Sequence, residues 1–558
     1  MKISFERCDS RLTQVADLTG TYQFTFDNMG RLTSTTTNYA FLTGRSFTTS
    51  YAYDKASNRT GFTDPENGAT SYVYDTLNRL QTLTPPSAFS GTGNFGFSYD
   101  ALSRRTQMTR PNGLKSIYAY DNLSRLLSVL HQSGSTTLDG AAYTVDNAGN
   151  RTSKTPQPGG TATNYGYDAI YQLLSATQGA TTTESYTYDP VGNRLSSLGV
   201  SPYNVNASNE LTSTPNATYT YDYNGNTQTK VVGSNTTTYT WDFDNRLASV
   251  TLPGTGGTVS FKYDPFGRRI YKSSSSGTSV FAYDGDNLIE ETNSSGAAVA
   301  RYEQTQNIDE PLAMLRSGAT SYYHADGLGS VTSLSNGAGS LAQTYGYDSF
   351  GKQTSSSGSL TNPFQYTARE SDTETGLYYY RARYYDPSVG RFLAEDSTRF
   401  ASGTYDFYPY VNNDPQNHSD AYGLQKDGGE TCCQDNIDIG RAELERALNN
   451  AQLMRGRIVK KYKDCLLSTL PTLKIRCNPT SKDCGLHVPV AVDTVVVTPL
   501  GSKGRKGPCG PLAATFLHEM IHLCYNLDLS GPKMSRSDQE KEAQQAECEV
   551  FGFNCRKR

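Results

Sequence analysis

One short pattern recurs through the first two thirds of this 558-residue sequence and constrains its fold more than any other feature. An aromatic residue is followed two positions later by Tyr-Asp, then by a turn, then by Asn-Arg-Leu or a near variant, as in YVYDTLNRLQTL from Tyr72 and YAYDNLSRLLSV from Tyr118. Successive copies are about 21–25 residues apart, a spacing typical of stacked structural repeats. Their aspartates include Asp54, Asp75, Asp100, Asp121, Asp146, Asp168 and Asp189.

Each copy of the pattern predicts a β-hairpin. Alternating aromatic residues favour a strand, the Asp, Asn and Gly residues favour a tight turn, and the Arg-Leu pair opens a second strand. Because a lone hairpin is marginally stable in water, the hairpins must join edge to edge in one continuous sheet that wraps or spirals. We therefore predict a mainly β fold, in which the arginine after each turn pairs with a motif aspartate in a structural role.

The composition excludes some classes of protein. Lys and Arg number 50 and Asp and Glu 54, which argues against a chain that coats nucleic acid or binds membranes through a basic surface. No stretch approaches the roughly 18–20 apolar residues of a membrane span, and the first residues, MKISFERCDSRLTQ, lack the apolar segment of a classical signal peptide. We expect neither a membrane span nor a nucleic-acid partner.

The repeats resemble the YD repeats of the Rhs family, and the resemblance extends beyond them. The stretch from YYHADGLGSVTSLSNGAG through RARYYDPSVGRFLAEDS to Leu424 resembles the Rhs repeat-associated core. In that family the repeats build a hollow β-cocoon, the core forms a plug and an aspartyl autoprotease, and a variable C-terminal toxin is released. The resemblance implies a shell at residues 1–350, a core at 351–424 and a toxin domain at 425–558.

The resemblance also implies a self-cleavage site. It places the catalytic aspartates at Asp396 and Asp420, a neighbouring arginine at Arg391, and the cut between Leu424 and Gln425. Two carboxylates that share a proton can activate a water molecule at one peptide bond.

This sequence departs from the family pattern at both aspartates. The expected Asp-Pro pairs are replaced by Asp396-Ser397 and Asp420-Ala421, which keeps the acids and loses the prolines. The alternative is that the two aspartates only stabilise turns.

After Leu424 the composition changes, which indicates a separate domain. Residues 437–467 have the apolar spacing of an amphipathic helix, and the valine-rich residues 490–498 predict a strand. Cysteines concentrate here without the spacing of a structural zinc site, so they are disulfide candidates, with buried free thiols as the alternative. They are Cys432, Cys433, Cys465, Cys477, Cys484, Cys509, Cys524, Cys548 and Cys555.

The strongest chemical signal of this C-terminal domain is the HExxH motif of His518, Glu519 and His522. On a helix, histidines four residues apart lie on one face and can bind one Zn²⁺, while the glutamate acts as general base. A catalytic zinc needs a third protein ligand, and no histidine follows the motif. The candidates on the next predicted helix are Glu540 and Glu547, and the one that is not the ligand could orient a histidine instead.

The segment around Glu540 resembles the Glu-x-x-Ala ligand helix of gluzincin metallopeptidases, and the domain resembles the zincin toxins found behind Rhs cores. That fold would place the strand at 490–498 on the rim of a substrate cleft, with an ordinary buried strand as the alternative. The resemblance thus implies a small α+β zincin-like domain.

The whole sequence is therefore expected to be a polymorphic toxin that releases a zinc protease. It would be delivered to a target cell without a classical signal peptide, act there on a protein substrate, and have an immunity protein and a secretion-system or chaperone partner. Two alternatives remain at this point. One is a non-enzymatic adhesion protein with a degenerate tail, and the other is a zinc amidase acting on peptidoglycan.

Overall fold

The computed structural model describes residues 2–5, 11–90, 93–399, 404–424, 474–477, 486–487 and 494–497. The chain divides into two compact units, one made of Met1–Ser4 and Thr13–Asp427 and the other of Phe5–Leu12 and Gly428–Arg558. Within the described residues, no helix is long and apolar enough to cross a membrane.

The first unit is almost entirely β-sheet, as the repeats predict, and it begins with an 18-stranded sheet that we call the first coil. From β2 onward each strand pairs with the next in antiparallel fashion. One helical turn, α1 (Ser87–Ser90), lies between β8 and β9. The strands are β1 Lys2–Phe5, β2 Leu12–Ala16, β3 Gly20–Phe26, β4 Leu32–Tyr39, β5 Phe47–Tyr53, β6 Arg59–Thr63, β7 Ala69–Tyr74, β8 Leu80–Thr84, β9 Phe95–Tyr99, β10 Arg105–Thr109, β11 Lys115–Tyr120, β12 Leu126–Ser133, β13 Thr136–Val145, β14 Arg151–Pro156, β15 Thr163–Tyr167, β16 Leu173–Gln178, β17 Thr181–Tyr188 and β18 Arg194–Ser197.

A 16-stranded sheet, the second coil, follows with the same antiparallel order. Its last strand extends beyond residue 350, where the sequence predicted the shell to end. The strands are β19 Asn204–Val205, β20 Leu211–Thr214, β21 Ala217–Tyr221, β22 Thr227–Val232, β23 Asn235–Trp241, β24 Leu247–Thr251, β25 Thr258–Tyr263, β26 Arg269–Ser274, β27 Gly277–Asp284, β28 Asn287–Thr292, β29 Ala298–Gln304, β30 Pro311–Arg316, β31 Ala319–Ala325, β32 Val331–Asn336, β33 Leu341–Tyr347 and β34 Gln353–Gly358.

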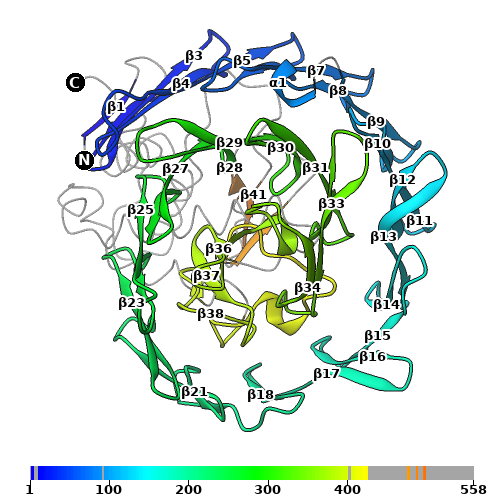
Figure 1. Ribbon diagram of the computed structural model, residues 1–558, viewed down its shortest axis with the longest axis vertical. Helices are drawn as coiled ribbons and strands as arrows, with labels where there is room; N and C mark the ends of the chain where they lie inside the picture. The colour runs from blue at the N-terminus through cyan, green and yellow to red at the C-terminus, as the bar shows by residue number, and fades with distance from the viewer. Residues whose placement is uncertain are drawn as a thin grey trace, which may run out of the picture. The chain divides into compact units, whose positions relative to one another are not determined.

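The repeat-associated core forms a small four-stranded sheet and two short 3-10 helices. These elements are η1 Tyr366–Ala368, β35 Glu370–Asp372, β36 Leu377–Tyr380, β37 Arg383–Asp386, β38 Arg391–Phe392 and η3 Val411–Asn413. The core sheet packs against the second coil through a buried apolar cluster and lies inside the arc of the coil strands (Figure 1). The cluster contains Tyr239, Leu247, Val250, Val259, Phe261, Tyr263, Leu377, Tyr379, Tyr384 and Leu393.

The two coils follow one spiral: β21, β23 and β25 continue the ring that the first coil begins, and the strands of the second coil from β27 onward lie inside that ring (Figure 1). Polar side chains join the coils along a seam. In order, the seam pairs include Arg45–Glu290, Thr70–Glu303, Arg110–Tyr323, Lys154–Asp326 and Glu184–Ser349. The difference in residue number between seam partners falls from 245 at the first pair to 165 at the last, so each successive turn of the spiral contains fewer residues.

The turn of each repeat is built around its aspartate. At Asp75, the carbonyl accepts the N–H of Asn78 at 3.0 Å, and the Oδ1 atom accepts the N–H groups of Leu77 and Arg79 at 2.9 and 3.0 Å. Asn78 has a φ of 59°, a left-handed conformation that glycine and short polar residues adopt more readily than others. The polar residues of the pattern are therefore the ones that this turn requires.

The arginine after the turn links its own repeat to the next one. Arg79 Nε donates to Asp75 Oδ2 at 2.7 Å, Nη1 donates to the carbonyl of Asp100 at 3.2 Å, and the guanidinium lies 4.8 Å from the Tyr99 ring centroid. The predicted structural pairing of arginine with a motif aspartate is confirmed. It recurs in Arg31–Asp27, Arg104–Asp100, Arg125–Asp121, Arg246–Asp242 and Arg268–Asp264.

The motif tyrosine links its repeat to the preceding one. Tyr74 Oη donates to the carbonyl of Arg59 at 2.8 Å, next to a one-residue register shift between Val73 and Tyr74. The same bond joins Tyr53 to Leu32, Tyr99 to Leu80, Tyr120 to Arg105, Tyr167 to Arg151, Tyr188 to Leu173, Tyr263 to Leu247 and Tyr347 to Val331. Since phenylalanine has no hydroxyl group, this bond explains why the position is a tyrosine.

In the C-terminal part of the second unit, the described residues form a three-stranded sheet of β39 Lys474–Cys477, β40 Leu486–His487 and β41 Thr494–Val497. The predicted strand at 490–498 is thus present as β41. It lies between β39, to which it is parallel, and β40, to which it is antiparallel. Both of its edges are paired, which favours the ordinary strand over a strand free to bind a substrate peptide. The predicted helix at 437–467 lies outside the described residues.

Glu303, a buried carboxyl group in the seam, predicts that the stability of the chain falls as the pH rises. Glu303 is 6% exposed, Thr70 Oγ1 donates to its carboxyl group at 3.0 Å, and burial raises its pKa from 4.5 to about 8. The folded chain therefore keeps a proton that the unfolded chain releases, so this group lowers the free energy of unfolding as the pH rises from 4.5 to about 8. Glu303→Gln is expected to remove that loss, measured by urea unfolding of the full chain between roughly pH 5 and 9.

Glu310 provides the matched control for this prediction. Burial raises its pKa, but the charge of Arg105 and the hydrogen bonds from Arg105, Thr305 and Asn307 together outweigh burial, so the pKa is lowered. Glu310→Gln should therefore leave the loss of stability at high pH in place. If Glu303→Gln keeps the full pH slope of the wild type, Glu303 is not the group responsible.

Candidate self-cleavage site

Asp396 and Asp420, the two aspartates that the sequence predicted to act together, lie beside one arginine in the core. Arg383 Nη2 is 3.1 Å from Asp396 Oδ2 and 3.5 Å from Asp420 Oδ2. The two aspartates are 3% and 2% exposed, and Arg383 is 5% exposed. The structure thus brings both predicted carboxylates to one buried, positively charged group.

Arg391, the arginine predicted for this site, lies elsewhere and is replaced by Arg383. Arg391 Nη2 is 3.4 Å from Asp406 Oδ1, and its Nη1 donates to Asn193 Oδ1 at 3.2 Å. The family resemblance implied Arg391, whereas the pairing of β37 with β38 places Arg383 at the aspartates. One signal could have identified Arg383: it stands in a run of buried aromatic residues, where a guanidinium group needs a carboxylate partner.

The turn after β38 fixes the orientation of the Asp396 carboxylate. Its Oδ1 atom accepts the backbone N–H of Thr398 at 2.8 Å and the Thr398 hydroxyl at 2.6 Å. The Oδ2 atom is left to face Arg383. Each oxygen of this carboxylate therefore has a defined partner.

A second turn fixes Asp420. Its Oδ1 atom accepts the N–H groups of Gly423 and Leu424 at 2.7 and 3.1 Å. Gly423 has a φ of 71°, and a Cβ atom there would lie 2.1 Å from the carbonyl oxygen of Tyr380. Only glycine fits this close approach, which explains the glycine of the Gly-Leu pair at the predicted cut.

The segment that leads to the predicted cut is held against β37. The N–H of Ala382 donates to the carbonyl of Tyr422 at 3.1 Å, and Arg383 Nε donates to the carbonyl of Gly423. The Thr398 hydroxyl lies 3.3 Å from the carbonyl oxygen of Leu424. The last described residue before the predicted cut is therefore adjacent to the Asp396 turn.

The predicted zinc-binding residues lie outside the described residues. They are His518, Glu519, His522, Glu540 and Glu547. In the part of the chain that the structure does describe, no group of three or more His, Cys, Asp or Glu side chains could hold a metal ion.

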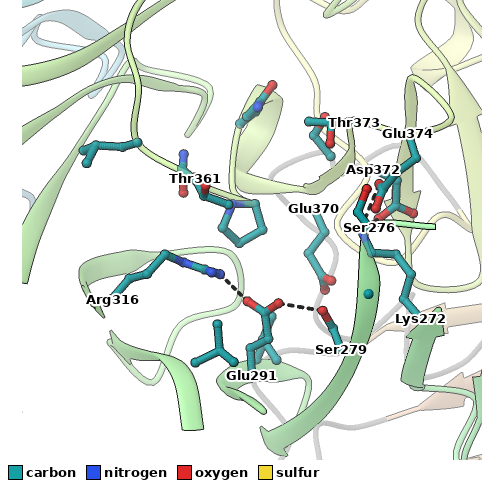
Figure 2. Close-up of a pocket in the computed structure, with 18 of the residues that line it drawn as sticks. Lys272, Ser276, Ser279, Glu291, Arg316, Thr361, Glu370, Asp372, Thr373 and Glu374 are labelled. Atoms are coloured by element: carbon teal, nitrogen blue, oxygen red, sulfur yellow. Dashed lines mark hydrogen bonds and ion pairs between the residues drawn. The ribbon is translucent and has the colours of Figure 1, made fainter. Parts of the chain in front are cut away.

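A cavity of about 950 Å³ lies between the second coil and the core, apart from the two aspartates (Figure 2). Its charged side chains are engaged with one another. Ser279 donates to Glu291, which also pairs with Arg316, and Lys272 pairs with Asp372 and Glu374 at 3.1 Å each. Glu291 and Arg316 both belong to the second coil, whereas the pairs of Lys272 join the coil to the core. The charged side chains of the cavity wall thus stabilise the fold.

Residues 156–416 match the family model described as the Teneurin YD-shell. This chain has the fold of a YD shell. Crystal structures agree with this assignment. A complex titled TcdB2-TccC3-Cdc42 matches with a TM-score of 0.62 and 18% identity, over 76% of this chain and 25% of that one. A second, titled TcdB2-TccC3, also matches with a TM-score of 0.62.

Curated relatives of this YD shell include two bacterial proteins. The tRNA3(Ser)-specific nuclease WapA of Bacillus spizizenii is 31% identical over 429 residues, and the tRNA nuclease WapA of Bacillus subtilis is 30% identical over the same length. Each alignment covers 73% of this chain but 16% of the relative. The chain thus spans a small part of the length of the curated relatives it matches.

Proposed function

We propose that this YD shell belongs to a polymorphic toxin that cuts itself after Leu424 and so frees residues 425–558 as an effector. The observation that carries the proposal is the contact of Arg383 with both Asp396 and Asp420, beside the chain segment that ends at Leu424. The names of several relatives, two of them WapA nucleases and one a double-stranded DNA deaminase toxin of Burkholderia cenocepacia, support a toxin role.

The proposed reaction is hydrolysis by the two carboxyl groups. One carboxylate takes a proton from a water molecule that attacks the Leu424 carbonyl carbon, and a carboxyl group then returns a proton to the departing nitrogen of Gln425. The positive charge of Arg383 allows two acidic groups to remain close together in the core.

Expression of the full-length chain tests this proposal. We expect two fragments, and sequencing of the smaller one should begin at Gln425. If the expressed full-length chain stays intact, self-cleavage is excluded.

For the effector we propose a zinc metallopeptidase, on the basis of the HExxH motif alone. The donor set of two imidazoles from His518 and His522 and one carboxylate from Glu540 or Glu547 suits Zn²⁺. A bound zinc would supply Lewis-acid activation of water and of a carbonyl group, and Glu519 would accept the proton. The names of the WapA relatives favour a second candidate, a nuclease effector.

The variant Glu519→Gln distinguishes these effectors. Expressed in a sensitive cell, it should lose at least about 100-fold of its killing activity while retaining metal, because the general base is not itself a ligand. His518→Ala should lose both killing and zinc. Full toxicity of Glu519→Gln would reject a metallopeptidase, and cleavage of cellular tRNA in the same cells would then support the nuclease.

A further inference from the structure

The hydroxyl group of Thr398 lies between the Asp396 carboxylate and the carbonyl oxygen of Leu424, the residue before the predicted cut. Thr398 Oγ1 is 2.6 Å from Asp396 Oδ1 and 3.3 Å from the carbonyl oxygen of Leu424. A hydroxyl group has one hydrogen, so it can donate fully to only one of these oxygens at a time. The shorter distance assigns that hydrogen to Asp396 in this structure.

Backbone hydrogen bonds position Thr398 and Leu424 independently of each other. On one side, the N–H of Thr398 donates to Asp396 at 2.8 Å and fixes where the threonine side chain begins. On the other side, the Asp420 carboxylate accepts the N–H of Leu424 at 3.1 Å and fixes the residue whose carbonyl would react. The Thr398 hydroxyl is therefore held close to the Leu424 oxygen by contacts that do not depend on the hydroxyl itself.

The hydrogen bonds of Arg383 go to oxygen atoms other than the Leu424 carbonyl oxygen. Its Nε atom donates to the carbonyl of Gly423, one residue before the cut, and its Nη1 atom donates to the carbonyl of Phe407 at 2.8 Å. The remaining Nη2 atom contacts the two aspartates. The guanidinium group thus has other partners, whereas the Thr398 hydroxyl reaches Leu424.

We propose that Thr398 is a catalytic hydrogen-bond donor, which stabilises the negative charge that develops on the Leu424 carbonyl oxygen; this inference rests on the proposed self-cleavage. When water attacks the carbonyl carbon, the C=O electron pair moves onto oxygen, and the water proton passes to Asp396. The protonated Asp396 no longer attracts the Thr398 hydrogen as strongly, so the hydroxyl turns toward the new oxyanion.

The rest of the step returns the protein to its starting state. The oxyanion collapses, the bond between Leu424 and Gln425 breaks, and the leaving nitrogen takes the proton from the carboxyl group. Thr398 keeps its own proton throughout and only changes the oxygen to which it donates. The reaction consumes one water molecule and needs no other reactant.

The test is the rate of self-cleavage of the full-length chain made by cell-free translation and sampled over time. Thr398→Val keeps the shape and the backbone N–H but removes the hydroxyl, and it should slow cutting by about 100-fold or more, as expected for the loss of one oxyanion donor. Thr398→Ser restores the hydroxyl and should cut within a few-fold of the wild-type rate. Ser397→Ala, at the exposed neighbouring position, is the matched control and should cut at the wild-type rate.

The outcomes separate this inference from the proposed function. If the wild type is cut, Asp396→Asn is not, and Thr398→Val is cut at the wild-type rate, the role of Thr398 is rejected and self-cleavage stands. If Thr398→Ser is as slow as Thr398→Val, the hydroxyl is not what matters and the inference is also rejected. If the wild type is never cut, self-cleavage fails, and the role of Thr398 fails with it.

Discussion

Asp420→Asn is expected to leave the full-length chain uncut. Asparagine keeps the size of the side chain and an oxygen that can accept the N–H groups of Gly423 and Leu424, which Asp420 binds at 2.7 and 3.1 Å. It cannot share or carry the proton that the reaction requires. Asp396→Asn should have the same effect, since each carboxyl group is needed. Gel electrophoresis of time-sampled translation reactions provides the measurement, with an expected rate loss of at least about 1,000-fold.

The chain offers a matched control for this prediction. Asp406 is also buried in the core, at 2% exposure, and also contacts an arginine, Arg391, at 3.4 Å. Asp406→Asn should therefore perturb the core to a similar degree without removing a reacting group. Continued cutting by Asp420→Asn, or equal loss of cutting in Asp406→Asn, would contradict the assigned pair of aspartates.

Arg269→Met is expected to lower the stability of the shell by about 3–5 kcal/mol, the usual cost of breaking a buried ion pair from one side. Arg269 is 1% exposed, and it pairs with Glu370 at 2.6 Å and with Asp372 at 2.5 Å. Its guanidinium also lies 4.5 Å from the Tyr379 ring centroid. Without the arginine, two buried carboxylates at the junction of β26 and β35 would lose their main counter-charge. Urea unfolding of the full chain measures the change.

Two variants set the limits of this effect. Adding Glu370→Gln and Asp372→Asn to Arg269→Met removes the unpaired charges and should recover much of the loss. Arg246→Met breaks the more exposed pair with Asp242 and should cost at most about 1 kcal/mol. If Arg269→Met and Arg246→Met lower the free energy of unfolding equally, burial does not increase the contribution of the Arg269 ion pairs to stability.

The repeat architecture could be predicted because it depends on local chemistry. The turn at Asp75 and the ion pair with Arg79 involve residues four apart in sequence, so the pattern itself contains both partners. The bond from Tyr74 back to Arg59 extends only to the preceding repeat. Periodicity was therefore sufficient to predict hairpins, their stacking and the structural role of the arginines.

The residues of the proposed cleavage site were harder to predict. The family resemblance supplied Asp396 and Asp420, but it implied Arg391, and the arginine that contacts both aspartates is Arg383. Arg383 reaches Asp396 because β37 pairs with β38, and it reaches Asp420 because the chain returns alongside β37 at Tyr422. Thr398 was missed because the role proposed for it depends on the distance from its hydroxyl to the Leu424 carbonyl oxygen, a contact between residues 26 apart in sequence.

The narrowing separation between seam partners makes the number of hairpins a structural constraint. Removing one hairpin between Arg45 and Glu290 would not simply shorten the sheet, because every later residue of the second coil would then face the wrong neighbour in the first. Extra residues can be accommodated more easily where a turn reaches solvent, as at Leu102 and Leu123, which are 64% and 71% exposed. Such a shell should therefore tolerate changes in the sequence and length of its exposed turns. It should tolerate few changes in the number of strands in each turn of the spiral.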